Sequence, residues 1–261
     1  MAPLPPVLPM PLVHLVASLA LVSPAMPAWA QAPESLDPPP TVSLPAGEPA
    51  CSAGNSIERL GPPSPSSPFP AALPPLQASL DDYRHKLRPT PYGWPRRDHW
   101  CVWVEPVDSN GASARWAQGW QVAVDAALER WGDLVAISRV EEPERAQVLV
   151  RRRRPPLRDG RASHGRAELE LVLRSHKGIT TPEPRVVVSI SPGQRQAAMQ
   201  ATALHELGHA FGLWGHSDHP ADAMAAVPGA TPVLELTPRD RATFRWLQQQ
   251  PGLQVPQAPP N

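Results

Sequence analysis

Proline sets the firmest limit on what this chain can fold into. Of its 261 residues, 38 are proline, and they crowd into residues 1–95 and the extreme C-terminus. Proline removes a backbone donor, and such stretches bury too little apolar surface to offset their ordering entropy. Only residues 93–250, on the order of 155 residues, carry the apolar periodicity of one compact domain. We expect residues 31–92 to be extended or disordered, and 251–261 to be a disordered tail.

The N-terminus has features of an export signal. Leu12–Val22 is a short apolar stretch, too short to span a bilayer, and Ala28-Trp29-Ala30 has the small-x-small pattern of a cleavage site. No Lys or Arg precedes Arg59, so the usual cationic start is missing. The alternative is a Pro/Ala-rich disordered terminus. We expect a cleaved signal peptide at residues 1–30 and a periplasmic or extracellular protein.

Charge points to no partner. Lys and Arg together number 24, as do Asp and Glu, so no long-range field of one sign attracts nucleic acid or an anionic membrane. The run Arg151–Arg154 is interpreted as a solvated strand end that discourages strand pairing. We therefore expect no nucleic-acid partner and no stable membrane insertion, and we expect a monomer.

Three helices are predicted. Between residues 113 and 131, apolar residues recur at three- and four-residue steps, so the tryptophans of this stretch should face the core. Residues 194–213 are rich in Ala, Gln, Met and Leu and lack proline, which favours a long helix. Thr237-Pro238-Arg239-Asp240 combines an N-cap, a first-turn proline and an acid, and predicts the start of a last helix. The tryptophans expected in the core are Trp116, Trp120 and Trp131.

Strands are predicted by β-branched runs and by alternation of polar and apolar residues. The first precedes the first helix, and the others lie between the first and second helices. The order is thus strand, helix, three or four strands, helix, loop and helix. The expected strands are residues 100–104, 134–140, 146–151, 167–173 and 185–191.

The run His205-Glu206-Leu207-Gly208-His209 lies within the second predicted helix. A spacing of four puts both imidazoles on one face about one turn apart, so they can share one ion. A catalytic zinc site takes three protein ligands plus a water whose pKa falls to about 7. Glu206 follows the first histidine directly and can remove a proton from that water as it attacks a peptide carbonyl. The motif predicts one catalytic Zn²⁺ with Glu206 as general base.

A glycine and a third histidine follow this run, which makes a chance match improbable. Gly212 can end the helix, and His216 is the first imidazole beyond it that can reach a tetrahedral position. Asp218 and His219 are rival third ligands. A peptidase whose third ligand is a glutamate on a later helix is disfavoured, because Glu235 precedes the last helix and does not lie inside it.

These residues resemble the metzincins, and within them the matrixin-like metalloproteases of bacteria. The metzincin zinc helix ends at a glycine and the third histidine follows three residues later, whereas here His216 follows Gly212 by four. Gly212–Ser217 is similar to a bacterial matrixin-like group with a Gly-x-Trp-Gly-His-Ser ending. Gly215 is expected to supply the unusual backbone angles of this longer loop. Metzincins also place a methionine beneath the metal, a position that Met224 matches.

The resemblance implies an α+β metzincin-like domain, with a twisted mixed sheet of about five strands, two long helices and a C-terminal helix. It implies a zinc metalloendopeptidase whose protein or peptide substrate lies along an edge strand, either 167–173 or 185–191. Two departures keep an alternative open: the loop is longer, and Ala225 and Ala226 stand where the family often has Tyr-Pro. That alternative is a catalytically weak, zinc-stabilised binding module outside the membrane.

Two cysteines occur in the chain, and their spacing does not fit a cysteine zinc site. Many matrixins block zinc with a propeptide cysteine in a Pro-Arg-Cys-Gly setting, but Cys51 lies in Pro49-Ala50-Cys51-Ser52. A disulfide between Cys51 and Cys101 is the preferred interpretation for an exported protein. Two free thiols and a cysteine switch are the alternatives.

Overall fold

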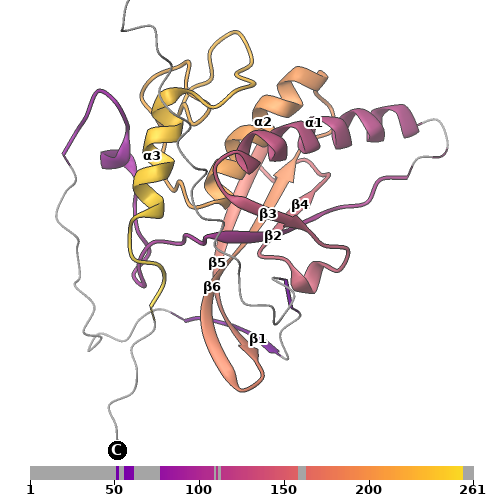
Figure 1. Ribbon diagram of the computed structural model, residues 1–261. Coiled ribbons are helices and arrows are strands. Elements are labelled where there is room, and N and C mark those ends of the chain that lie inside the picture. The colour runs from indigo at the N-terminus through magenta and orange to yellow at the C-terminus, as the bar shows by residue number, and fades with distance from the viewer. Residues whose placement is uncertain are drawn as a thin grey trace, which may run out of the picture. The chain divides into compact units, whose positions relative to one another are not determined.

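The computed structural model describes residues 51–52, 56–61, 77–108, 110, 113–157 and 163–254. The expected signal peptide at 1–30 and the tail from residue 255 onward lie outside the described residues. The described part is an α+β fold with one mixed sheet of six strands and three α-helices (Figure 1). The predicted class and the predicted number of helices are confirmed, and the sheet has one strand more than expected.

The sheet combines parallel and antiparallel pairs. Its order is β1-β5-β6-β4-β2-β3, in which β6, β4, β2 and β3 run parallel and β5 and β1 pair antiparallel. Of the two candidate edge strands, β6 is interior, and β5 lies next to the outer strand β1, which pairs only with its residues Val172–Ser175. The strands are β1 (Ser56–Arg59), β2 (His99–Val104), β3 (Ala136–Arg139), β4 (Val148–Arg151), β5 (Gly165–His176) and β6 (Ile179–Ile190).

The β5-β6 hairpin is longer than the sequence pattern predicts. Its turn residues Lys177 and Gly178 have φ of 48° and 79°, both left-handed, as in a type I′ turn. Pro182 and Pro184 interrupt the strand pattern in the sequence, so the first half of β6 was not predicted. Their nitrogens face the side of β6 on which β4 pairs only from Val186 onward. Their missing N–H groups therefore leave no ladder bond unmade.

Helices α1 (Ala114–Gly132) and α2 (Gln196–Ala210) lie on the same side of the sheet, and α3 (Pro238–Gln248) follows the loop after α2 (Figure 1). The predicted N-cap of α3 is confirmed as a capping box between Thr237 and Asp240. Among the described residues, no helix has the length and apolar character needed to cross a membrane.

The main hydrophobic core lies between the sheet and the helices α1 and α2. Trp120 and Trp131 are fully buried there, and their indole N–H groups donate to the carbonyls of Ile190 (3.2 Å) and Leu204 (2.9 Å). The prediction that Trp116 faces the core is wrong, because its side chain is 65% exposed. The first turn of α1 projects beyond the sheet (Figure 1).

Folded structure begins upstream of residue 93. Tyr83 and Leu87, on either side of the 3₁₀ turn η2 (Arg84–Lys86), are buried in the main core. Strand β1 was not expected in the proline-rich stretch. Both segments owe their order to partners far along the chain, which composition cannot reveal.

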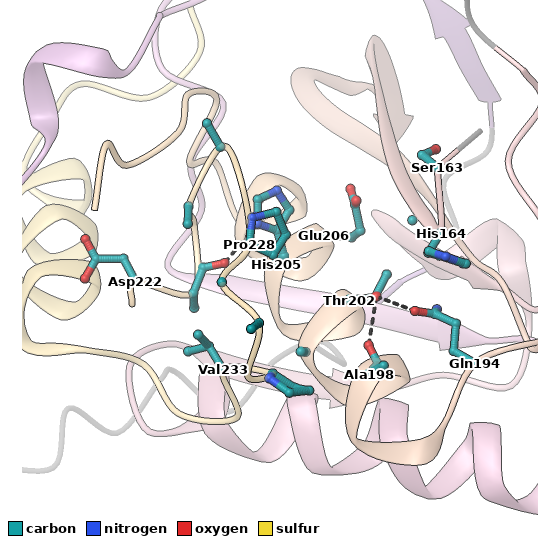
Figure 2. A pocket seen from close by; sticks show the side chains of 18 residues that line it. Ser163, His164, Gln194, Ala198, Thr202, His205, Glu206, Asp222, Pro228 and Val233 are labelled. Carbon is teal, nitrogen blue, oxygen red and sulfur yellow. Dashed lines mark hydrogen bonds between the residues drawn. The ribbon is translucent and has the colours of Figure 1, made fainter. Parts of the chain in front are cut away.

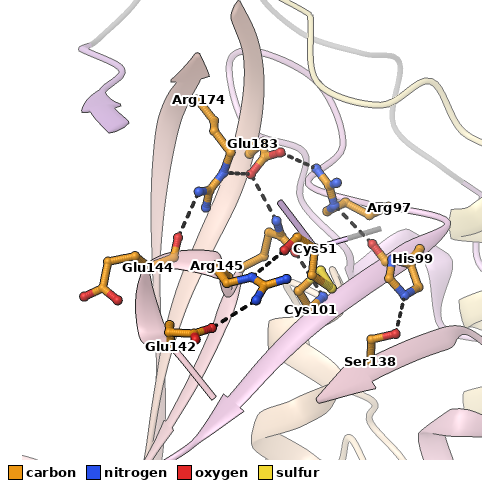
Figure 3. The surroundings of a disulfide bond; sticks show 11 residues. Cys51, Arg97, His99, Cys101, Ser138, Glu142, Glu144, Arg145, Arg174 and Glu183 are labelled. Atoms are coloured by element: carbon orange, nitrogen blue, oxygen red, sulfur yellow. Dashed lines mark hydrogen bonds and ion pairs between the residues drawn. A yellow bond between two sulfur atoms is a disulfide. The ribbon is translucent and has the colours of Figure 1, made fainter. Parts of the chain in front are cut away.

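Cys51 and Cys101 form a disulfide, with their Cα atoms 5.7 Å apart (Figure 3). The structure therefore contains the preferred disulfide, and not two free thiols or a cysteine switch. The neighbours of Cys101 in β2 face the helix-side core, so by strand alternation Cys101 lies on the opposite face of the sheet. There Arg145 Nε donates to the carbonyl of Cys51 (2.7 Å), and a buried pair joins Arg174 to Glu183 (2.8 Å). The disulfide ties the segment before β1 to β2, four strands away in the sheet.

Candidate metal centre

Helix α2 carries two of the histidines and ends at Gly212. Gly212 has φ +111°, its N–H donates to the carbonyl of His209 (3.0 Å), and the Leu213 N–H donates to that of Gly208 (2.9 Å). These two bonds form a Schellman cap. A Cβ at Gly212 would also lie 2.9 Å from the carbonyl oxygen of Pro95. The glycine ends the helix, as expected, and turns the chain toward the third histidine.

The structure brings His205, His209 and His216 together. One ring nitrogen of each lies within 4.8 Å of the others, and the ring centroids are 4.9, 5.2 and 4.8 Å apart. Asp218 is exposed and pairs with Arg239 (3.0 Å). His219 is exposed, as His216 also is, but it belongs to no potential metal cluster among the residues described. The geometry therefore favours His216 over both rivals as a third ligand.

Hydrogen bonds orient the two helix imidazoles. His205 Nδ1 lies 2.9 Å from the carbonyl oxygen of Ala223, and His209 Nδ1 lies 2.7 Å from that of Leu213. A carbonyl only accepts, so each Nδ1 donates and each Nε2 of the neutral ring carries a lone pair. His209 Nε2 then lies 3.2 Å from His216 Nε2, a pair that needs a shared proton or cation. This donor set fits zinc, which binds neutral imidazole nitrogens.

Burial favours the neutral form of all three rings. It lowers the pKa of His209 to about 3, with a further contribution from the neighbouring imidazole of His205. It also lowers the pKa of His205 and of His216. Neutral imidazole is the form that binds a metal. Trp214 stacks on His209 with 5.5 Å between ring centroids, which shields that ring from water.

Glu206 lies beside these rings and is only 9% exposed. Burial raises its pKa to about 7, against the opposing effects of the Ala167 N–H and the charge of Arg166. A carboxyl group that titrates near neutral pH can both accept and return a proton. The first residue of β5 lies against it, because a Cβ at Gly165 would be 2.6 Å from Glu206 Cγ. The start of β5 therefore lies against the candidate general base.

Met224 is fully buried and packs against Gly208 of the histidine motif. A Cβ at Gly208 would lie 2.2 Å from Met224 Sδ and 3.0 Å from the ring of Trp131. The glycine inside the histidine motif is therefore required by packing. This role was missed from sequence, because it depends on a loop that returns to the helix from a later part of the chain.

A buried carboxylate of α3 holds the loop that contains Met224. Asp240 accepts hydrogen bonds from the Ala223 N–H (2.8 Å) and from the Tyr83 hydroxyl (2.7 Å). The carbonyl of Ala223 in turn accepts the Nδ1–H of His205. Asp240 thus positions a histidine through the backbone of one residue, Ala223. The sequence identified it only as a capping residue.

Gly215 has a different role from the one expected. Unlike Gly212 it does not have a positive φ, so the prediction of unusual backbone angles is wrong. A Cβ at Gly215 would instead lie 2.3 Å from the carbonyl oxygen of Lys86. Next to it, the Arg88 N–H donates to the carbonyl of Trp214 (2.9 Å). Glycine is needed here because the loop with the third histidine packs directly on the backbone around η2.

A cavity of about 660 Å³ opens beside His205 and Glu206 (Figure 2). Part of its wall is polar, where the Thr202 hydroxyl donates to the carbonyl of Ala198 (2.8 Å) and lies 3.2 Å from Gln194 Oε1. Small side chains make up much of the wall, which leaves the cavity wide enough for a large side chain. The alanines of the wall are Ala198, Ala201, Ala223, Ala225, Ala226 and Ala230.

No model of a known protein family matches the chain, and no curated protein matches its sequence. The chemistry of this site is therefore inferred from its own residues and their geometry.

Proposed function

We propose that this protein is a zinc-dependent metalloendopeptidase, which hydrolyses internal peptide bonds of proteins or peptides. The observation that carries the proposal is the convergence of His205, His209 and His216 within 4.8 Å, next to the buried carboxyl group of Glu206. A zinc ion held by these three imidazoles would lower the pKa of a bound water and polarise the carbonyl of the scissile bond.

Glu206 is the general base in this proposal. It accepts a proton from the attacking water while the water oxygen bonds to the carbonyl carbon. It returns that proton to the amide nitrogen as the C–N bond breaks, so the products are a carboxylic acid and an amine. Its buried position beside the histidines, and its raised pKa of about 7, suit a group that must carry the proton in both directions.

β5 offers a binding edge for the substrate. Among the described residues, β1 pairs with Val172–Ser175, while no strand pairs with the outer edge of Gly165–Glu170. An extended peptide can add to such an edge through main-chain hydrogen bonds. This edge leads to Glu206, and the cavity beside Glu206 can receive a substrate side chain.

Zinc analysis combined with cleavage of a generic unfolded protein tests the proposal. We expect the wild type to bind one equivalent of zinc and to cleave. Glu206→Ala should keep the zinc and lose activity by a factor of about 10²–10⁴, since it lacks the general base. His216→Ala should bind zinc weakly. His219→Ala is the matched control and should retain both properties.

Two outcomes would contradict parts of this proposal. Zinc binding by the wild type without cleavage of any substrate would favour the zinc-stabilised binding module. Unchanged zinc affinity in His216→Ala would move the third ligand to Asp218 or His219.

A further inference from the structure

We propose that β1 blocks one end of the β5 edge along which the substrate binds. The site then binds only a short stretch of polypeptide on the amino side of the scissile bond. This inference rests on the proposed peptidase function and deepens it. It names the substrates as short peptides, or flexible chain segments that can turn away from the edge soon after the cleavage site.

β1 occupies the same edge that a substrate strand would use. It pairs antiparallel with Val172–Ser175, and the N–H of Leu60 adds a bond to the carbonyl of Leu171 (2.8 Å). The direction of β1 leads toward Gly165 and therefore toward Glu206. A substrate strand with the same antiparallel orientation would lie in line with β1, with its amino-terminal end next to Leu60.

Among the residues that the structure describes, the part of this edge without a paired strand is short. Because Leu171 directs its carbonyl outward, the two-residue period of the strand also directs the backbone groups of Leu169 and Ala167 outward. Ala167 is already at the site, since its N–H bonds to Glu206. A strand rises about 3.3 Å per residue, so the edge between this point and Leu60 accommodates about four substrate residues.

β1 is anchored on both sides, so a substrate does not displace it easily. Upstream, the disulfide of Cys51 ties the chain to β2. Downstream, the Tyr92 hydroxyl donates to the carbonyl of Gly61 (2.8 Å). The last residue of β1, Arg59, also forms an ion pair with Glu170 of β5. β1 therefore acts as a fixed stop.

A series of fluorogenic peptides tests this inference on the zinc-loaded protein. All peptides share one scissile bond and one carboxyl-side sequence, and the amino side grows from two to eight residues. For the wild type, kcat/KM should rise up to about four residues and then level off or fall. Extension of the carboxyl side serves as the internal comparison and should not show this limit.

The double variant Glu58→Pro/Leu60→Pro removes two N–H groups that face β5. It should detach β1 from β5 and so free the rest of the edge. Its kcat/KM should continue to rise with amino-side length, by about fivefold for each further set of main-chain hydrogen bonds. Glu58→Ala/Leu60→Ala is the matched control, because it keeps both N–H groups and should show the wild-type limit.

A wild-type kcat/KM that keeps rising well beyond four residues would overturn the inference, and this measurement needs no variant. The same holds if the folded proline variant shows the same limit as the alanine control. Failure of every peptide to be cleaved by the zinc-loaded wild type would overturn the peptidase function itself, and this inference with it.

Discussion

Glu206 and Asp240 are both buried carboxylic acids near the histidine cluster, but their surroundings differ in the number of hydrogen-bond donors. Asp240 is fully buried and accepts bonds from the Tyr83 hydroxyl and from the backbone of the loop at Ala223. Glu206 has the Ala167 N–H as its backbone donor, and its burial raises its pKa to about 7.

The difference separates a positioning role from a chemical one. Hydrogen-bond donors stabilise the charged form of a buried carboxyl group, whereas burial without enough donors disfavours it. The hydrogen bonds that Asp240 accepts hold the loop at Ala223 against α3. Glu206 is left with a charge that is costly to keep, which suits a group that exchanges protons. Substitutions at the two acids should therefore change stability in opposite directions.

Asp240→Asn should have the largest effect on stability. The amide NH₂ would face hydrogen-bond donors in place of a second accepting oxygen, so the free energy of unfolding should fall by about 3–5 kcal/mol. Urea denaturation followed by fluorescence measures this change. Asp125→Asn is the matched control, because Asp125 is exposed on α1 and its ion pair with Arg139 should contribute less than about 1 kcal/mol. Equal losses in the two variants would contradict the role assigned to Asp240.

Glu206→Gln should stabilise the metal-free protein at alkaline pH. The pKa of Glu206 in the folded protein, about 7, lies above its ordinary value of 4.5. The folded state therefore binds more protons than the unfolded state between these values, and the wild type loses stability as pH rises through them. Glutamine stays neutral and still accepts the Ala167 N–H. We expect a gain of about 1–3 kcal/mol at pH 8, and a difference that vanishes as pH falls below 4.5.

Chemical denaturation in the presence of a chelator, repeated across this pH range, measures the difference. Glu168→Gln on the exposed side of β5 is the control and should show no comparable pH dependence. If Glu206→Gln gave no gain in stability at pH 8, the charged form of Glu206 would not be destabilised in the folded protein. The contrast drawn between Glu206 and Asp240 would then be wrong.

Tyr83→Phe should have the smallest effect. It removes one donor from Asp240 and leaves the backbone donors in place, so the free energy of unfolding should fall by about 1 kcal/mol. A double-mutant cycle sharpens the measurement. In the Asp240→Asn background, the same substitution should cost less than in the wild type, because its partner is already changed. Additive losses would show that the hydroxyl stabilises the fold independently of Asp240.

Local signals predicted the elements around the site well. The apolar spacing of α1, the proline-free stretch of α2 and the capping box at Thr237 each act within a few residues. Predictions failed where a distant segment decides the outcome. The exposure of Trp116 depends on how far α1 extends past the sheet, and β1 exists because β5 supplies its hydrogen-bond partners.

By itself, the sequence determined that His205 and His209 share one helix face and that the helix stops at Gly212, since helix periodicity and backbone sterics depend only on nearby residues. Tertiary structure decided that His216 joins them and that β5 carries the open edge. It also explains why residue 208 must be glycine, because the later loop that contains Met224 packs directly on the helix there. These contacts join segments far apart in the chain, and they follow from the path of the whole backbone, which a local pattern does not specify.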